Sequence, residues 1–260
     1  MMEGGITWAA PTAEPSAMRP RTAALWITCL GDVFFPGIGL AAARILASQG
    51  VRPEFPEGQT CCGQPAFNAG FCPEARSMAL HFLEVFEGAE CIVSPSGSCV
   101  SMVRCHYPGL FDGDRALRER FEALGRRTFE LSEFLTEVLR IGSTGARFPH
   151  RVTYHDSCHS LRSLGLRDGP RRLLRAVEGV ELLDLASSET CCGFGGVFSV
   201  KYPEISMAMC SDKVARIEES GAEYVVATDA SCLMHIGGAL QRRGSKVKTL
   251  HLAEILAAGL

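Results

Sequence analysis

One cysteine pattern occurs twice in this chain of 260 residues: a single cysteine, a vicinal pair followed by glycine, and a further single cysteine. The second copy follows the first at offsets of 129, 130 and 133 residues. Two vicinal pairs in register, each flanked by matching cysteines, indicate an internal duplication. The chain is therefore expected to fold as two similar halves. The eight repeated residues are Cys29, Cys61, Cys62 and Cys99 in the first copy, and Cys158, Cys191, Cys192 and Cys232 in the second.

Short apolar runs alternate with amphipathic stretches in both halves, and this alternation predicts parallel sheets with right-handed crossovers. The expected fold class is α/β, with two Rossmann-like halves related by a pseudo-twofold axis. Strands are expected at residues 23–29, 51–55 and 91–94, and at 151–155, 180–185, 224–228 and 247–250. Helices are expected at residues 38–48, 75–86, 170–177, 204–219, 233–241 and 253–258.

The chain divides into four segments. Residues 1–20 are rich in Ala, Pro and Gly without periodicity and predict a disordered extension, in which Met18 is a second possible start. The first half is expected at 21–141, ending in helical stretches at 121–125 and 131–139 that lead toward the second half. A linker is expected at 142–149, and the second half at 150–260.

Each of the three cysteine positions in each half follows a predicted strand. Ligand sites of parallel α/β sheets form at the carboxyl ends of the strands, so the cysteines of one half should converge on one edge of its sheet. Three loops that deliver four thiolates to one point have the geometry of a metal or cluster site. All eight repeated cysteines are therefore candidate metal ligands.

The spacing of the cysteines bears on which metal they bind. Zinc sites with four thiolates usually take pairs spaced C-x₂₋₄-C, and no two cysteines here are three residues apart. Adjacent cysteines suit one tetrahedral ion poorly, whereas they can grip a larger cluster from two sides. Gly63 and Gly193, directly after the pairs, can adopt φ > 0 and let the backbone curve around a bulky cofactor. Iron–sulfur clusters held by four cysteines fit this arrangement best.

Composition excludes other classes of protein. A chain of this length buries a core without disulfides, and its net charge of −3 gives no reason to expect nucleic acid as a partner. Residues 18–43 look like an export signal, but Asp32 and Pro36 interrupt the apolar run and Cys29 is needed by the repeat. We therefore expect a cytoplasmic protein with no membrane span.

The motifs resemble those of a known family. The segments TCLGD, FPEGQTCCGQPAFNAG, SPSGSC, HDSCH, CCGFGGVFSVK and CLMHIGG resemble the duplicated cysteine-rich CCG domain, and most closely the lactate utilization protein A family. The resemblance covers both halves, from Cys29 to about Gly238. It implies an iron–sulfur electron-transfer subunit of a complex that oxidises L-lactate to pyruvate. It also implies two companion lactate-utilization proteins, an iron–sulfur subunit and a third subunit.

The sequence departs from the wider CCG pattern, which ends each half in C-x-x-C. Ser96 and Asp229 stand where that pattern has its additional cysteines. With four cysteines per half, one or two ordinary [4Fe-4S] clusters are the simpler expectation than the noncubane clusters of heterodisulfide reductase B. Ser96 and Asp229 remain candidates for an oxygen ligand, although such residues in turns usually cap backbone groups. His159, next to Cys158, is a candidate for hydrogen bonding to the cofactor, although ordinary packing of this residue and of His155 is the simpler expectation.

Two alternatives stay open at this stage. The first is a thiol/disulfide oxidoreductase of the heterodisulfide reductase B type, and the second is a zinc-bound structural subunit without a redox role. No catalytic acid–base pair is evident in the sequence, so an oxidoreductase activity would belong to the complex rather than to this chain alone. The four cysteines outside the repeat are expected to be structural: Cys72, Cys91, Cys105 and Cys210.

Overall fold

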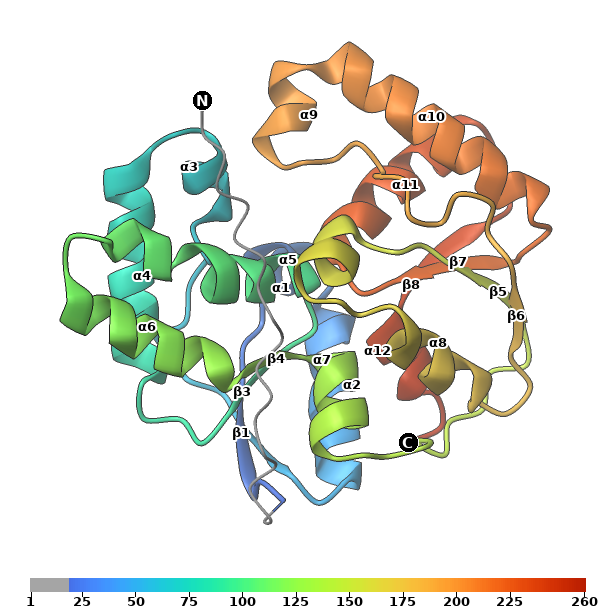
Figure 1. Ribbon diagram of the computed structural model, residues 1–260. Helices are drawn as coiled ribbons and strands as arrows, with labels where there is room; N and C mark the ends of the chain where they lie inside the picture. The colour runs from blue at the N-terminus through green and yellow to red at the C-terminus, as the bar shows by residue number, and fades with distance from the viewer. Residues whose placement is uncertain (1–18) are drawn as a thin grey trace.

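The computed structural model describes residues 19–260, so nearly all of the expected extension at residues 1–20, including Met18, lies outside the described residues. Two four-stranded parallel sheets form the scaffold (Figure 1). The strands are β1 (Thr22–Leu25), β2 (Arg52–Glu54), β3 (Ile92–Ser94) and β4 (Thr128–Glu130) in the first half, and β5 (Arg151–Tyr154), β6 (Glu181–Leu183), β7 (Tyr224–Ala227) and β8 (Lys248–His251) in the second.

The two sheets have the same topology. The first has the order β2-β1-β3-β4 and the second the order β6-β5-β7-β8, with every neighbouring pair parallel. Each half thus begins on an inner strand, adds one neighbour on one side, and then crosses over to the other side. This repetition confirms the expected α/β fold with two pseudo-twofold related halves.

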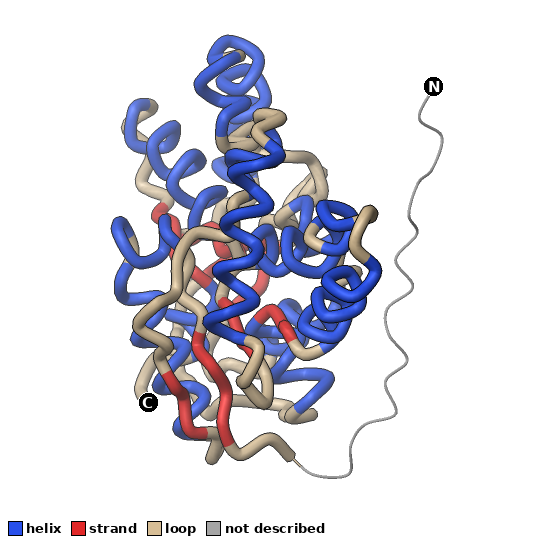
Figure 2. The backbone as a smooth tube through the Cα atoms, turned by 90° about the vertical axis from the view of Figure 1, so that its left-hand side faces the viewer, coloured by secondary structure: helices blue, strands red, loops and turns tan. Residues whose placement is uncertain are grey.

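Helices connect the strands and cover the sheets, as Figure 2 shows from the side. In the first half they are α1 (Cys29–Phe34), α2 (Pro36–Ser48), α3 (Gln64–Asn68), α4 (Cys72–Phe86), α5 (Gly97–Ser101), the π-helical turn η1 (Met102–His106), the 3₁₀ turn η2 (Pro108–Phe111), α6 (Arg115–Arg126), α7 (Leu131–Glu133) and the π-helical turn η3 (Phe134–Val138). In the second half they are the π-helical turn η4 (His159–Ser163), α8 (Asp168–Arg175), α9 (Val197–Lys201), α10 (Pro203–Glu219), α11 (Ala230–Arg242) and α12 (Leu252–Leu256).

A central hydrophobic core joins the two halves. Helix α2 of the first half packs against α12 of the second, and α7 packs against α8 (Figure 1). Ile45 and Leu46 from α2 and Ile255 and Leu256 from α12 are completely buried in this core. Burying a side chain of this size contributes about 1.5–3 kcal/mol. Each half therefore depends on the other for a large part of its apolar burial.

The outer side of each sheet has a core of its own. In the first half Trp26 packs edge-on against Phe82, with ring centroids 4.7 Å apart, and both are almost fully buried. In the second half the outer core includes Val214 and Ile217 from α10 and Ile236 from α11. These two cores hold the helices that carry the third cysteine position of each half.

Two local details differ from the sequence-based expectations. The first predicted strand was extended to residue 29, but β1 ends at Leu25 and Cys29 begins helix α1. The stretch between the two helices expected at 121–125 and 131–139 contains a fourth strand, β4, which pairs with β3. The sequence of β4 contains one apolar residue, Phe129, and lies between two helical stretches, so it carries no strand pattern of its own.

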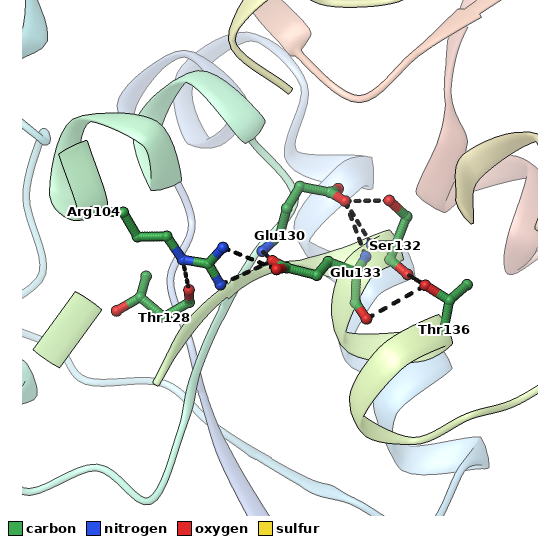
Figure 3. A network of polar contacts seen from close by, with 6 residues as sticks. All are labelled: Arg104, Thr128, Glu130, Ser132, Glu133 and Thr136. Carbon is green, nitrogen blue, oxygen red and sulfur yellow. Dashed lines mark hydrogen bonds and ion pairs between the residues drawn. The ribbon is translucent and has the colours of Figure 1, made fainter. Parts of the chain in front are cut away.

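A buried polar network fixes β4 to the helix that follows it (Figure 3). Arg104 donates to both carboxylate oxygens of Glu133 at 2.9 Å and to the carbonyl of Thr128 at 2.6 Å. Glu130 caps α7 by accepting from the backbone N–H groups of Ser132 and Glu133. Thr136 donates to the carbonyl of Ser132 at 2.9 Å. Because Arg104 is only 4% exposed, this ion pair is part of the interior.

The segment that looks like an export signal forms part of the folded scaffold. From residue 22 onward it supplies β1, α1 and the first turns of α2. Across residues 19–260, the helices are all too short or too polar to serve as a membrane span.

Candidate metal centre

The four repeated cysteines of the first half meet at the carboxyl edge of the first sheet. Cys29 begins α1 after β1, and Cys99 lies in α5 after β3. The vicinal pair lies in the loop between β2 and α3. The Sγ atoms of Cys29 and Cys61 are 3.6 Å apart, and so are those of Cys62 and Cys99. The predicted convergence of these residues is therefore present in the fold.

The second half repeats this arrangement. Cys158 directly precedes η4 after β5, and Cys232 lies in α11 after β7. Cys191 and Cys192 lie in the loop between β6 and α9. All twelve cysteines of the chain fall within the described residues, and all are free thiols. Each half thus presents four cysteine side chains from three loops.

Both cysteine sets face the same cleft. Its empty space is ≈ 850 Å³, part of it open to solvent, and all eight repeated cysteines line it. Ser96, Asp229 and His159 are also among the lining residues. The two sites predicted from the sequence are therefore two walls of one cleft between the halves. The cavity volume of ≈ 120 Å³ is several times the space that one water molecule needs, so the cleft can hold a group larger than a single ion.

Buried side chains hold the first CCG loop in place. The hydroxyl of Tyr107, itself fully buried, donates to the carbonyl of Cys62 at 2.9 Å. The Gln59 side chain accepts from the backbone N–H of Ile27 at 2.6 Å and donates to the carbonyl of Leu25 at 3.2 Å. The loop is thereby tied to the end of β1 and to the residues that lead from it to Cys29.

Different residues hold the second CCG loop. Ser206 of α10 donates to the carbonyl of Gly193 at 2.8 Å. Lys213, further along the same helix, donates to the carbonyls of Ser187 at 2.7 Å and Ser188 at 3.1 Å. Lys213 is 1% exposed, and Ser187 adopts a positive φ of 56°. Helix α10 therefore determines the path of the chain into Cys191.

Gly63 and Gly193 both adopt positive φ, at 77° and 89°. The closest neighbours of a Cβ at these positions would be helical residues rather than the cleft. At Gly63 it would lie 3.3 Å from the Met78 side chain, and at Gly193 it would lie 2.5 Å from the carbonyl oxygen of Ser206. Glycine is thus required by backbone conformation and by close packing on α4 and α10. The glycines that do line the cleft are Gly195 and Gly196, in the loop after the second cysteine pair.

The thiols of each half differ in pKa. The hydrogen bond with Cys29 lowers the pKa of Cys61 to about 3, and the hydrogen bond with Cys158 lowers the pKa of Cys191 to about 2. The same hydrogen bonds, together with burial, raise the pKa values of Cys29 and Cys158. Each half therefore presents an anionic sulfur, which is the form of cysteine that binds metal. Loading the remaining thiols with metal would release their protons.

Ser96 and Asp229 lie at the cleft, but their side chains bind each other. Oδ1 of Asp229 accepts hydrogen bonds from Ser96 Oγ at 3.0 Å, from Ser98 N at 3.0 Å and from Ser98 Oγ at 2.7 Å. Neither side chain caps the helix that it precedes. Asp229 therefore binds a backbone N–H in the first turn of α5 in the other half, and not one of its own helix α11.

The two histidines near Cys158 differ in their surroundings. His159 lines the cleft, with Nδ1 3.7 Å from the Cys158 sulfur. His155 is fully buried, and neither of its ring nitrogens has a hydrogen-bond partner among the described residues. One of these nitrogens and the sulfurs of Cys192 and Cys232 lie within 4.8 Å of one another. From the sequence, His159 is a candidate for hydrogen bonding to the cofactor, and ordinary packing is the expectation for His155.

The four cysteines outside the repeat are placed differently. Cys91 and Cys210 are buried in the protein core, Cys105 is half-buried, and Cys72 is exposed at the start of α4. The residues described as lining the cleft include all eight repeated cysteines and none of these four. The geometry is consistent with the predicted division of the cysteines into eight and four.

Comparison with known proteins identifies the family. The cysteine-rich CCG domain matches residues 23–104 and again residues 152–237, one match in each half. The chain is 48% identical over 239 residues to lactate utilization protein A of Exiguobacterium sp., an alignment that covers 91% of this chain and 97% of that protein. The chain belongs to the lactate utilization protein A family, and it carries the cysteine-rich CCG domain twice.

Other lactate utilization protein A sequences match over a similar length. The Geobacillus sp. protein is 45% identical over 232 residues, covering 89% of this chain and 97% of that protein. Among solved structures, a hypothetical protein from Helicobacter pylori has a TM-score of 0.67 at 12% identity. The match covers 94% of this chain, which spans about half of the Helicobacter protein, since 50% of that chain is covered. This likeness supports the fold alone.

Proposed function

We propose that this protein is an iron–sulfur electron-transfer subunit in the oxidation of L-lactate to pyruvate. The observation that carries the proposal is the convergence of two four-cysteine sets on one cleft. Four thiolates per half form the ligand set of cubane iron–sulfur clusters. The lactate substrate comes from the names of relatives that are 45–48% identical over nearly their whole length.

In each half the ligands would be the four repeated cysteines, giving one or two clusters, with [4Fe-4S] as the expected type. When bound, such a cluster supplies a carrier of single electrons. The residues of this chain hold the group and set its environment. Cys61 and Cys191 offer sulfurs that are already anionic, and the loop anchors Tyr107 and Lys213 fix the paths of the two CCG loops.

The proposal extends to partners and location. Since no acid–base pair for removing hydrogen from lactate is recognised in the sequence, the substrate would be handled by companion proteins, an iron–sulfur subunit and a third subunit. His159 at the cleft would hydrogen bond to the sulfur of Cys158. Twelve free thiols suit a reducing compartment, so we place the protein in the cytoplasm.

Two other functions compete with this one. A thiol/disulfide oxidoreductase of the heterodisulfide reductase B type is supported by the single cleft that both cysteine sets share. Against it, Ser96 and Asp229 replace the additional cysteines of that type and bind each other. A zinc-bound structural subunit is disfavoured by the spacing of the cysteines, because four-thiolate zinc sites usually take C-x₂₋₄-C pairs and this sequence has none.

Growth on lactate tests the proposed function. A strain that lacks the gene is complemented with the wild type, with the double variant Cys61→Ser and Cys191→Ser, or with Cys210→Ser. We expect the wild type and Cys210→Ser to restore growth on L-lactate as the sole carbon source, and the double variant to fail. All three strains should grow equally on glucose. Growth of the double variant on lactate would overturn the proposal.

A further inference from the structure

His155 is a buried polar side chain without a hydrogen-bonding role in the fold. It follows β5, and its backbone N–H donates to the carbonyl of Val226 at 2.8 Å. The side chain is 0% exposed, and both ring nitrogens lack a partner among the described residues. An unpaired buried polar group costs on the order of 1–3 kcal/mol. We expect this cost to be offset by a group that the His155 ring contacts when the site holds its cofactor.

The nearest candidates are two sulfurs of the second cysteine set. A ring nitrogen of His155 and the sulfurs of Cys192 and Cys232 lie within 4.8 Å of one another, and all three residues are buried. His155 is not among the described residues that line the cleft, so it approaches these sulfurs from the protein interior.

The first half has no equivalent group. The residue that corresponds to His155, at an offset of 129, is Trp26. Its ring N–H points to the carbonyl of Thr60 at 3.4 Å. Trp26 is fully buried against Phe82, so its ring is held in the outer core of the first half. The two cysteine sets are thus alike in their sulfurs and different in the ring beside them.

We propose that His155 donates its ring N–H to the thiolate of Cys232 and makes the second-half cluster the more easily reduced of the two. The inference rests on the proposed iron–sulfur function. A neutral imidazole always carries one N–H, so the donor requires no change of protonation. Hydrogen bonds to cluster sulfurs are among the factors that set the reduction potential. A donor to sulfur stabilises the form with the additional negative charge, which is the reduced form.

This difference in reduction potential would favour electron transfer from the first-half site to the second-half site. With clusters bound in both halves, one electron given up by the first-half cluster would be one electron taken up by the second-half cluster, and the hydrogen bond would favour its residence in the second half. His155 acts through Cys232, so it is a positioning residue rather than a ligand. The second half would therefore be the side from which an electron-accepting partner takes the electron.

A redox titration followed by electron paramagnetic resonance tests the inference. It compares the anaerobically purified wild type with His155→Phe, which keeps an aromatic ring without a donor, and with His155→Gln, which keeps an N–H. We expect two potentials in the wild type. His155→Phe should lower only the potential of the signal that Cys191→Ser removes, with unchanged iron and sulfide, and His155→Gln should recover part of the shift. His150→Phe, at a partly exposed residue that precedes β5 and does not line the cleft, should change neither potential.

The possible outcomes separate the two proposals. Unchanged potentials in His155→Phe and His155→Gln would overturn the role of His155 and leave the iron–sulfur function standing. Loss of iron from both variants would also overturn it, because the imidazole would then be a ligand. A wild-type protein without iron and labile sulfide would overturn the proposed function, and the inference with it.

Discussion

Asp229 in the second half accepts a hydrogen bond from the hydroxyl of Ser98 in the first half, at 2.7 Å. The same carboxylate also accepts from Ser98 N and Ser96 Oγ, and its other oxygen accepts from Ser160 at 3.4 Å. Asp229 is 1% exposed, so these bonds form away from water. A single buried carboxylate thereby fixes the two cysteine sets relative to each other.

Replacing Asp229 by Asn should destabilise the protein. The change removes the charge that strengthens three hydrogen bonds from the first half, and it places an N–H₂ group where an acceptor is needed. We expect the free energy of unfolding to fall by about 2–4 kcal/mol, measured by urea denaturation. The exposed Asp184→Asn should change it by less than about 0.5 kcal/mol. Similar effects of the two replacements would refute the proposed bridge.

The same variant separates a bridging role from metal ligation. Because donors from the protein occupy the Asp229 oxygens, Asp229→Asn should keep the iron content of the wild type in protein purified anaerobically at low temperature. Cys232→Ser, three residues further on, should lose the second-half iron. If both variants lost the same amount of iron, Asp229 would be a ligand.

The buried ion pair between Arg104 and Glu133 should contribute far more than an exposed pair. Arg104→Met leaves the Glu133 carboxylate and the Thr128 carbonyl without their donor in the interior. We expect a loss of about 3–5 kcal/mol in the free energy of unfolding. Arg115→Met, which breaks an exposed pair with Glu119, is the matched control and should cost under about 0.5 kcal/mol. Equal losses would show that the network of Figure 3 does not stabilise the fold.

Glu130 makes stability depend on pH. Burial raises its pKa from 4.5 to about 8, so the folded protein retains a proton that the unfolded chain releases above pH 4.5. Its contribution to stability is therefore complete below pH 4.5 and is lost as the pH rises through 8. Glu130→Gln cannot titrate, so its stability relative to the wild type should increase over this range by about 4 kcal/mol.

Denaturation of wild type and Glu130→Gln at several pH values between 5 and 9 measures this difference. The exposed Glu119→Gln serves as the control, and its difference from the wild type should stay constant across the range. A constant difference for Glu130→Gln as well would show that Glu130 is ionised in the folded protein throughout.

Lys213 should be needed for the loop that leads to Cys191. Lys213→Met removes the donor to two loop carbonyls, and Ser187 would lose the contact that holds its positive φ. We expect a loss of about 1–3 kcal/mol in stability and faster proteolytic cleavage within residues 185–190. The exposed Lys201→Met should behave as the wild type in both measurements. Unchanged cleavage of Lys213→Met would mean that the loop holds its path without this side chain.

The repeated sequence pattern predicted the arrangement of the cysteines well. In each half, the three cysteine positions come directly after three parallel strands. The carboxyl ends of neighbouring parallel strands lie at the same edge of a sheet. The local sequence pattern was therefore sufficient to predict that Cys29, Cys61 and Cys99 converge. It was not sufficient for β4, which contains a single apolar residue between two helical stretches and whose place depends on pairing with β3.

The shared cleft could not be predicted from either half alone. It depends on how α2 packs against α12, and that packing sets which loops of the two halves face each other. The bond between Asp229 and Ser98 and the shared cleft follow from this packing. Ordinary packing was the expectation for His155 for a similar reason, since its position behind Cys232 depends on the tertiary structure and not on its closeness to Cys158 in sequence.

The content of iron and acid-labile sulfide in anaerobically purified protein tests the central claim most directly. We predict a brown protein with iron and sulfide in similar amounts. Cys61→Ser and Cys191→Ser should each lose the cluster of their own half, and Cys210→Ser should keep the wild-type content. A colourless protein that holds zinc without labile sulfide would contradict the account, and so would equal iron contents in all three variants.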